Sequence, residues 1–354
     1  MSGGDPAFGG AGCGCVRWLP VTSPDLRTLP KAELHLHIEG TLEPELAFAL
    51  AERNGVTLPF ADVDDLRRRY DFEDLQSFLD LYYACMAVLR TEQDFTDLAT
   101  AYLERAAADG VRHVEMFFDP QVHAVNGVPV DVVIYGLRAG LDIGRERFGI
   151  TGGLIVCIVR DHPVASAEAL LDEIAPRAHE LLGIGLDSAE VGYPPSLFEG
   201  VFRRAAELGL RRVAHAGEEA PAAYVWEALR LLEVERVDHG IRSIDEPELL
   251  AHLAEHRVAL TVCPLSNVRL RAVPELSAHP LRELVDAGVV VTINSDDPSY
   301  FGGYIGDNYA AVASLGFDTA ELAQLAANSI EASFADAGRK ADLLAQVREW
   351  AASA

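Results

Sequence analysis

Short apolar runs alternate with longer amphipathic segments along most of this chain. Ala-, Leu-, Glu- and Arg-rich stretches with helical spacing, such as EGVFRRAAELG (199–209), separate the apolar runs. Near-continuous apolar strands separated by helices indicate a parallel sheet that is covered on both faces. The predicted strands are AELHLHI (32–38), VRHVEMFF (111–118), GGLIVCIV (152–159), IGLDSAEV (184–191), LRRVAHA (210–216), ERVDHG (235–240), VALTVCP (258–264) and VVVTINS (289–295).

The number of predicted strands decides the fold class. Eight strands in one alternating α/β chain predict a single closed (β/α)8 TIM barrel. A doubly wound open sheet is the alternative, but no GxGxxG motif follows a strand to support a dinucleotide site. The 354 residues, 49% of them hydrophobic, are enough to bury one large core.

The connection after the first strand is unusually long. No strand is predicted between Thr41 and Asp109, but several segments there have helical spacing, including DFEDLQSFLDLYYACMAVL (71–89). We therefore expect a helical insertion after strand 1. Its apolar and aromatic side chains are expected to pack against the core, and the insertion is expected to cap the mouth of the barrel.

The N-terminal segment differs from the rest of the chain. Gly, Pro and Ser punctuate residues 1–28 and no periodicity is sustained, which predicts a flexible tail before a barrel domain at residues 29–354. Cys13 and Cys15 form a CxC pair in this tail. Metal binding by that pair is an alternative, but no second pair accompanies it, so a flexible tail is preferred.

The net charge and the cysteine content limit the binding partners and the cellular location that the sequence allows. The formal net charge is −26, so the chain would repel nucleic-acid phosphates and anionic membrane surfaces, while an isolated base or nucleoside is not excluded. No apolar run reaches the roughly 18 residues that cross a bilayer. Five cysteines, three of them in apolar contexts, indicate reduced thiols and a cytoplasmic location. A homo-oligomer is left open.

Polar side chains gather at the C-terminal ends of the predicted strands, where a TIM barrel builds its active site. His35 and His37 lie two residues apart in the first strand, so both side chains point to the same side and form half of a metal site. The other polar residues at strand ends are Glu39, Asp119, His123, Asp187, Ser188, Glu190, His215, Glu218, Asp238, His239, Asp296 and Asp297.

Three histidines and one aspartate suit one borderline divalent ion, Zn²⁺ first and Fe²⁺ second, with an open position for water. Such an ion lowers the pKa of that water towards about 7. The chemistry then needs a proton shuttle, and Glu218 follows His215 where the chain leaves its strand. A lone histidine in a strand is more often a core residue. The alternative role for Glu218 is to cap the next helix or to be a solvated surface charge. We prefer this alternative for Glu219.

These motifs resemble the adenosine/adenine deaminase branch of the metal-dependent amidohydrolases. The resemblance runs from about Leu29 to the C-terminal helices, with the motifs in the expected order. It rests on ELHLHIEGTLEPEL, FFDPQVH, GLDSAEVGYPP, VAHAGEEAP, RVDHGIR, TVCPLSN and NSDDPSYFGGY.

The resemblance implies a (β/α)8 barrel and a role for each matched residue. Glu218 matches the residue that protonates the purine ring nitrogen next to the reacting carbon, and His239 matches the histidine that orients and helps activate the metal-bound water. Asp297 matches the acid that hydrogen-bonds N7, and it points away from Asp296 if the strand stays extended. Asp296 would also accept a proton from the water. The implied metal ligands are His35, His37, His215 and Asp296.

Within the branch, the sequence favours adenine over adenosine as substrate. The nucleoside enzymes have HLDG after the HxH pair, whereas this chain has HIEG, and the longer Glu39 would crowd the space for a sugar. Ser188 and Glu190 are expected near the N3/N9 edge of a free base. Departures from the adenine group at Tyr193, Ala220 and residues 160–162 leave three alternatives open: adenosine, N6-substituted adenines and aminodeoxyfutalosine.

Two other classes of protein remain. A purine-binding pseudoenzyme is one, although all the matched site residues are present. A binuclear amidohydrolase is the other, but no apolar strand end offers the bridging lysine that such enzymes usually have, since Lys31 precedes the HxH strand and Lys340 lies near the C-terminus. Metal counting separates these classes, because one ion per chain supports the deaminase.

Overall fold

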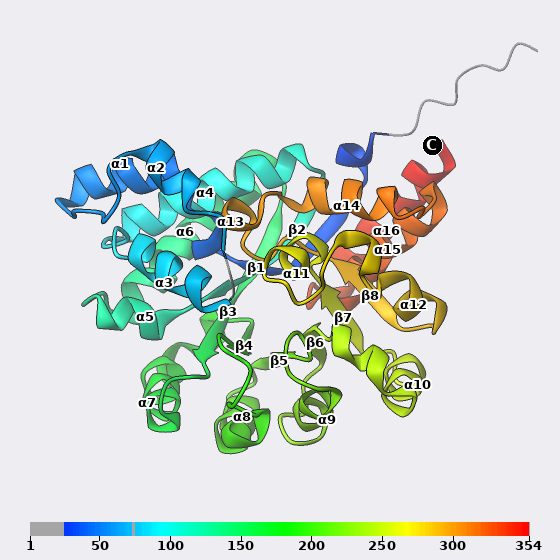
Figure 1. Cartoon of the computed structure of the whole chain (residues 1–354). Coiled ribbons are helices and arrows are strands. Elements are labelled where there is room, and N and C mark those ends of the chain that lie inside the picture. The colour runs from blue at the N-terminus through cyan, green and yellow to red at the C-terminus, as the bar shows by residue number, and fades with distance from the viewer. Residues whose placement is uncertain (1–24, 73–74, 354) are drawn as a thin grey trace, which may run out of the picture.

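Eight parallel strands form the centre of the computed structural model, which describes residues 25–72 and 75–353. Each strand pairs with the next one along the chain, and the helices surround the strands (Figure 1). The predicted TIM barrel is confirmed. The strands are β1 (Lys31–His37), β2 (Val111–Phe118), β3 (Thr151–Val159), β4 (Gly183–Asp187), β5 (Arg211–Ala216), β6 (Arg236–His239), β7 (Ala259–Val262) and β8 (Val290–Ile293).

Backbone hydrogen bonds around Asp296 join the last strand to the first. The His37 N–H donates to the carbonyl of Asp296 at 3.0 Å, and the Asp296 N–H donates to the carbonyl of His35 at 3.2 Å. Leu36 and Asp296 form the corresponding parallel bridge. The backbone that closes the barrel therefore also carries three of the predicted metal ligands.

Helices follow the strands and cover the outside of the barrel. Helices α4 and α6 pack against each other, and α15 packs on β1 and β8. The helices are α1 (Pro44–Asn54), α2 (Val63–Arg68), α3 (Leu75–Met86), α4 (Glu92–Ala108), α5 (Pro120–Val125), α6 (Val130–Phe148), α7 (Val164–Ile174), α8 (Glu199–Glu207), α9 (Ala222–Arg230), α10 (Pro247–Glu255), α11 (Pro264–Arg269), α12 (Leu281–Asp286), α13 (Pro298–Phe301), α14 (Ile305–Ser314), α15 (Thr319–Ala332) and α16 (Ala337–Ser353).

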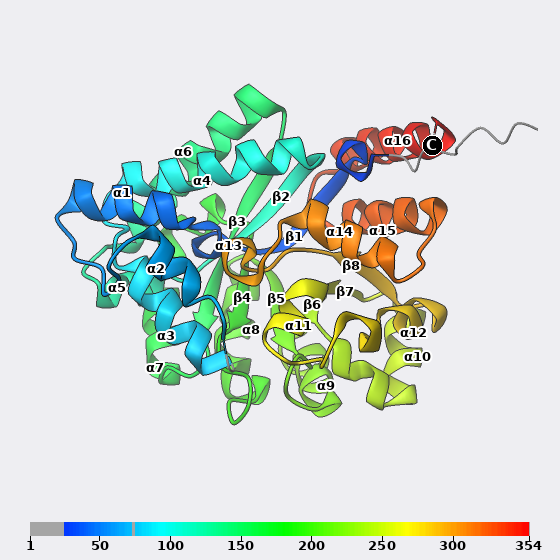
Figure 2. The same cartoon turned by 45° about the horizontal axis from the view of Figure 1, so that its top comes forward.

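The predicted helical insertion after strand 1 consists of α1 to α4 (Figure 2). Phe78, Leu79 and Tyr82 of α3 are buried, and together with Tyr83 they line the pocket at the C-terminal ends of the strands. Both expectations for this segment are confirmed, because the same helix packs on the core and covers the mouth of the barrel.

Three strands end in residues with left-handed backbone conformation. Ser188 follows β4 with φ 67°, His239 ends β6 with φ 58°, and Asp296 follows β8 with φ 67°. This conformation costs a residue other than glycine about 1–3 kcal/mol and is found mainly at functional sites. Strand β4 therefore ends earlier than predicted. The backbone is not extended at Asp296, so the alternation expected for Asp296 and Asp297 does not apply.

A buried ion pair occupies the opposite, N-terminal end of the barrel. Arg236 Nη1 lies 2.7 Å from Glu115 Oε2, and Arg236 Nη2 donates to the carbonyl of Leu34 at 3.1 Å. Burial opposes the charge of Glu115, but Arg236 and His113 outweigh burial and lower its pKa to about 2. Charged side chains at this end are typical of stability rather than catalysis in TIM barrels.

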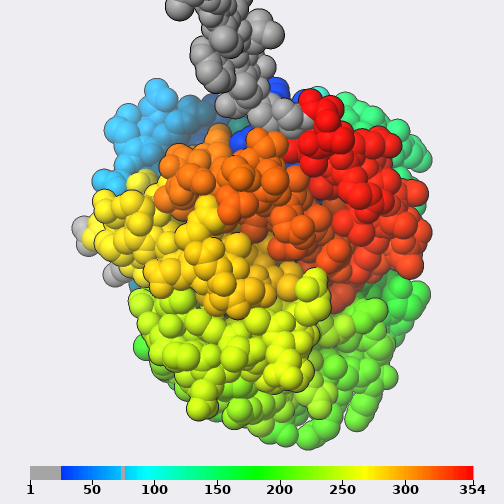
Figure 3. Space-filling view, turned by 90° about the vertical axis from the view of Figure 1, so that its right-hand side faces the viewer, coloured from blue at the N-terminus to red at the C-terminus, as the bar shows by residue number. Residues whose placement is uncertain are grey.

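The predicted tail lies partly outside the described residues. Residues 1–24, with Cys13 and Cys15, are not described. The short helix η1 (Leu26–Thr28) lies against α16, since the Trp350 indole N–H donates to Thr28 Oγ1 at 2.8 Å. Figure 3 shows the C-terminal helices, orange to red, covering this side of the barrel. Within residues 25–72 and 75–353, no helix is long and apolar enough to cross a membrane.

Candidate metal and active site

The C-terminal ends of the strands enclose a pocket of about 420 Å³. Residues from six strands or strand ends and from the insertion contribute to it, as expected for a TIM-barrel active site. The lining residues are His37, Phe78, Leu79, Tyr82, Tyr83, Asp119, Asp187, Ser188, His215, Glu218, His239, Leu270, Asp296 and Asp297.

The structure brings the four predicted metal ligands together. Asp296 Oδ1 lies 3.3 Å from His35 Nε2 and 3.5 Å from His37 Nε2. His37 Nε2 lies 3.2 Å from His215 Nε2. Ligand atoms that surround one Zn²⁺ tetrahedrally at 2.0–2.1 Å are about 3.3 Å apart. These three contacts match that spacing, as expected if one divalent ion binds here.

The protonation and burial of the imidazoles also fit a metal. His35 Nε2 is buried and has no hydrogen-bond partner in the protein, an arrangement that a metal bond would satisfy. Burial lowers the pKa of His37 to about 4 and holds the pKa of His215 well below its usual value, with neighbouring imidazoles adding to the effect at His215. Both rings are therefore neutral at pH 7, which is the form that binds a metal.

Each of the three histidines has a polar partner at its other ring nitrogen. His35 Nδ1 lies 3.0 Å from Thr261 Oγ1 and 3.2 Å from the Thr261 carbonyl. His37 Nδ1 lies 3.6 Å from an Asp187 oxygen, and His215 Nδ1 lies 3.7 Å from an oxygen of Asp238. The Thr261 contacts at Nδ1 orient the His35 ring and leave its Nε2 free for a metal, whereas the carboxylates near His37 and His215 lie beyond hydrogen-bond distance.

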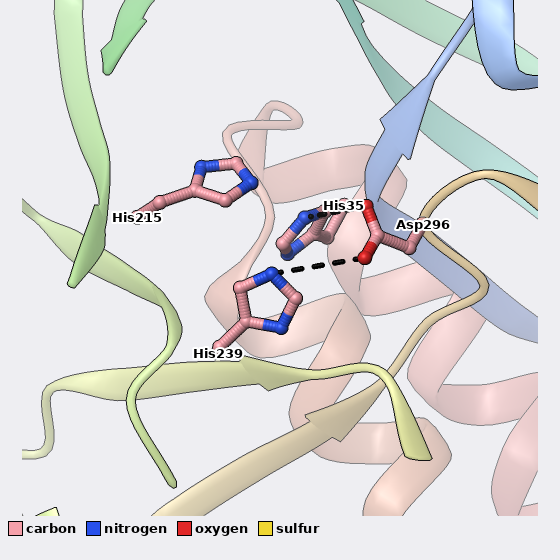
Figure 4. A group of neighbouring side chains, drawn as sticks. All are labelled: His35, His215, His239 and Asp296. Carbon is pink, nitrogen blue, oxygen red and sulfur yellow. Dashed lines mark ion pairs between the residues drawn. The ribbon is translucent and has the colours of Figure 1, made fainter. Parts of the chain in front are cut away.

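His239 lies on the other side of the Asp296 carboxylate. Its Nε2 is 3.7 Å from Asp296 Oδ2, whereas His35 faces Oδ1 (Figure 4). His239 Nε2 also lies 3.4 Å from Glu218 Oε2, and His37 faces Asp296 Oδ1. His239 is nonetheless close enough to form a potential metal-binding group with His35, His215 and Asp296. Its ring centroid lies 4.6 Å from that of His35 and 5.1 Å from that of His215, and its Nε2 also contacts Glu218.

Glu218 and Asp297 are both buried carboxyl groups that line the pocket. Burial, followed by the nearby Asp296, raises the pKa of each of them well above its usual value. A protonated carboxyl can donate a hydrogen bond or a proton to a ligand. Asp297 Oδ1 lies against Gly40, where a Cβ would be 2.0 Å from it, so a glycine at position 40 is required for this placement.

Glu190 does not occupy the place expected for it beside a purine. Its carboxylate accepts four successive backbone N–H groups, those of residues 217–220, at 2.5–3.1 Å. It is buried and does not line the pocket, whereas Ser188 does. Glu190 therefore holds the loop that carries Glu218. The sequence showed its position after a strand but not this partner.

Glu190→Gln is expected to destabilise the protein by about 1–3 kcal/mol and to lower kcat, because an amide NH₂ would face N–H donors and the Glu218 loop would shift. Urea unfolding and kcat measurements test this. Glu227→Gln is the matched control, since the Glu227 carboxylate accepts one backbone N–H, that of Ser196 at 2.9 Å, among the described residues and does not line the pocket. Wild-type stability and kcat in Glu190→Gln would contradict the assignment.

Glu39 also has a different place from the one expected. Its Oε1 accepts the Asp119 N–H at 3.1 Å and lies 2.8 Å from His123 Nε2. Glu39 is fully buried and does not line the pocket, so it does not itself crowd a sugar. The enclosing side chains come instead from α3, including Tyr83, whose hydroxyl lies 3.3 Å from Ser188 Oγ.

Two residues next to the site were missed from the sequence, although the CPLSN motif after the seventh strand contains both. Ser266 Oγ donates to Asp296 Oδ2 at 2.6 Å. Asn267 Nδ2 lies 3.1 Å from His239 Nδ1 and 3.3 Å from Glu218 Oε1. The departure at Tyr193 lies away from the pocket, while Arg160 donates to the carbonyl of His215 at 2.7 Å.

A TIM barrel with imidazoles and a carboxylate converging at its strand ends is typical of metal-dependent hydrolases. The family model described as adenosine deaminase matches residues 30–350. An adenine deaminase of Streptomyces coelicolor is 59% identical, over 92% of this chain and 96% of that protein. An adenine deaminase of Albidiferax ferrireducens is 56% identical, over 88% and 90%. The chain belongs to the adenosine deaminase family.

Solved structures agree with this membership. The crystal structure of an adenine deaminase from Arthrobacter aurescens has a TM-score of 0.90 and 57% identity, and the match covers 92% of this chain and 99% of that one. An amidohydrolase from Burkholderia ambifaria with bound Zn has a TM-score of 0.85 and 31% identity, with 96% of each chain covered. The resemblance inferred from the motifs is therefore confirmed.

Proposed function

We propose that this protein is an adenine deaminase, which hydrolyses adenine at C6 to hypoxanthine and ammonia in purine salvage. It is thus a hydrolase of C–N bonds in cyclic amidines (EC 3.5.4.2). The observation that carries this proposal is the 59% identity to an adenine deaminase over 92% of the chain. The pocket, which is lined by imidazoles and carboxyl groups, supports it.

One divalent ion belongs at His35, His37, His215 and Asp296 in this proposal. Zn²⁺ is the first choice, because three imidazoles and one carboxylate suit it and a related amidohydrolase has bound Zn, and Fe²⁺ is the second. When bound, such an ion lowers the pKa of a coordinated water so that hydroxide is available at neutral pH.

Each side chain around the proposed metal position has its own part in the proton transfers. Asp296 accepts the proton of the attacking water, and His239 orients the water. Glu218, protonated because it is buried near other carboxylates, donates to the ring nitrogen next to C6 as the water oxygen bonds to C6. Asp297 hydrogen-bonds N7. The C6–N bond then breaks as the proton taken up by Asp296 passes to the amino group, which leaves as ammonia. The C6 hydroxyl returns its proton to Glu218 and becomes a carbonyl, so that adenine and water give hypoxanthine and ammonia.

Adenine is expected to exceed adenosine in kcat/KM by about 100-fold or more, because a sugar must displace packed side chains. Phe78, Leu79, Tyr82 and Tyr83 of α3 close the pocket over the base. The measurement is the ultraviolet absorbance change on deamination for adenine, adenosine, N6-substituted adenines and aminodeoxyfutalosine. A preference for adenosine would make adenosine deaminase the function instead. Binding without turnover of any of these compounds would support a purine-binding pseudoenzyme.

The cellular location and the binding partner that we propose follow from the thiols and the net charge. Cys85, Cys157 and Cys263 are free and buried, which suits a reducing cytoplasm. A net charge of −26 disfavours nucleic-acid partners, so the partner is the small purine itself.

A further inference from the structure

His279 lies outside the pocket but is connected to it by hydrogen bonds. It is buried between the short helix η6 (Leu276–Ala278) and α12, and it does not line the pocket. Its Nδ1 lies 3.0 Å from the backbone N of Leu281, and its Nε2 lies 3.2 Å from Asn267 Oδ1. Asn267 in turn contacts His239 and Glu218.

A backbone N–H group fixes which atoms donate and which accept in this chain of hydrogen bonds. The Leu281 N–H is at the first position of α12, where it has no partner within the helix, and it can only donate. His279 Nδ1 must therefore accept. Burial lowers the pKa of His279 to about 4, so the ring is neutral at pH 7 and carries its one proton on Nε2.

The proton on His279 Nε2 sets the orientation of the Asn267 amide. Since Nε2–H donates to Oδ1 of Asn267, the Asn267 NH₂ group faces the pocket. Asn267 Nδ2 lies 3.1 Å from His239 Nδ1 and 3.3 Å from Glu218 Oε1, and it donates to both. His239 Nδ1 then accepts, and a neutral His239 carries its proton on Nε2, which faces Glu218 Oε2 and Asp296 Oδ2.

Asp296 Oδ2 faces His239 Nε2 at 3.7 Å, which is beyond hydrogen-bond distance, so the groups in the pocket do not fix this choice by a hydrogen bond of their own. A protonated Glu218 can donate to the amide oxygen or accept from the amide nitrogen, and a neutral His239 can carry its proton on either nitrogen. Without His279, the Asn267 amide could therefore turn over and favour the other tautomer of His239. We propose that His279 is a positioning residue that, through Asn267, keeps the proton of His239 on Nε2.

This inference rests on the proposed function for its catalytic consequence. A protonated Nε2 can donate to the attacking water and cannot bind a metal, so His239 acts beside the ion and not as its ligand. The tautomer itself is a property of this chain's hydrogen bonds and can be measured without substrate.

Two substitutions separate this role from simple capping of α12. His279→Asn keeps an acceptor near the position of Nδ1 but is too short to reach Asn267, whereas His279→Gln keeps a donor near the position of Nε2. We expect His279→Asn to lower kcat for adenine about 10- to 100-fold, with KM, metal content and thermal stability close to wild type. His279→Gln should retain most of the wild-type kcat even if it loses stability.

A control variant and a spectroscopic measurement complete the test. His113→Phe removes a buried histidine at the N-terminal end of the barrel and should lower stability without lowering kcat. Nitrogen-15 NMR of histidine-labelled, metal-loaded protein, with His239→Asn for assignment, should show His239 protonated on Nε2 in wild type and partly on Nδ1 in His279→Asn.

Wild-type kcat in His279→Asn, equal losses in the Asn and Gln variants, or a wild-type His239 protonated on Nδ1 would each overturn the proposal. If the wild-type protein does not turn over any of the purines, the proposed function fails. The NMR comparison of wild type with His279→Asn then still decides whether His279 sets the tautomer.

Discussion

Glu218→Gln is expected to lower kcat for adenine by about 10²–10⁴-fold while the bound metal stays in place. The carboxyl lies in the pocket, 3.4 Å from His239 Nε2, and Asn267 donates to its other oxygen. Glutamine keeps the size of the side chain but cannot transfer a proton to the ring nitrogen. Steady-state kinetics and metal analysis on the same preparation measure both quantities.

The control for this variant is Glu219→Gln, which changes the neighbouring acid outside the pocket lining and should retain most of the activity. The pH profile gives a second test. Glu218 must be protonated to act as an acid and its pKa is raised, so kcat/KM falls as the pH rises through that pKa. That alkaline decrease should be absent in Glu218→Gln. Near-normal turnover in the metal-loaded variant would disprove the role of Glu218.

Removal of the metal is expected to abolish activity and to lower the melting temperature. A ligand present at about 1,000 times its dissociation constant stabilises the folded state by about 4 kcal/mol, and this stabilisation is lost on chelation. Asp296 carries both a proposed ligand oxygen and the backbone groups that join β1 to β8, so the effect should extend to barrel closure. Dialysis against a chelator, followed by activity assays and calorimetry, tests both effects.

Adding metals back identifies the ion and counts it. Zn²⁺ and Fe²⁺ are added separately, and the ion that restores activity at one equivalent per chain is the functional one. Counting matters because His37, Asp119 and Asp187 also form a potential metal-binding group. Two ions per chain would favour a binuclear amidohydrolase, and full activity of metal-free protein would exclude the proposed mechanism.

The strands, and the clustering of His35, His37, His215 and Asp296, were predictable because both depend on local patterns. Apolar runs between helical segments predicted all eight strands, and β2 has the predicted bounds. The HxH spacing placed His35 and His37 on one side of β1, where they meet Asp296 and His215. Period-two alternation could not predict the left-handed conformation at Asp296, which depends on how the barrel closes.

The two incorrect placements involved carboxylates whose partners are distant in sequence. Glu39 is held by His123 and the Asp119 N–H, and Glu190 by the backbone of residues 217–220. A carboxylate at a strand end has many possible partners, and its position in the sequence does not select one. Burial next to specific donors selects it, and that burial exists only after the barrel has formed.

The sequence alone determined the barrel, since strand periodicity depends on local chemistry, and its motifs gave the proposed metal ligands and the proposed proton donor. Only the tertiary structure decided which carboxyl groups face the pocket, that α3 encloses it, and that hydrogen bonds connect His279 through Asn267 to His239. The reason is physical, because hydrogen-bond direction and the exclusion of water depend on atoms that the fold brings together from separate segments.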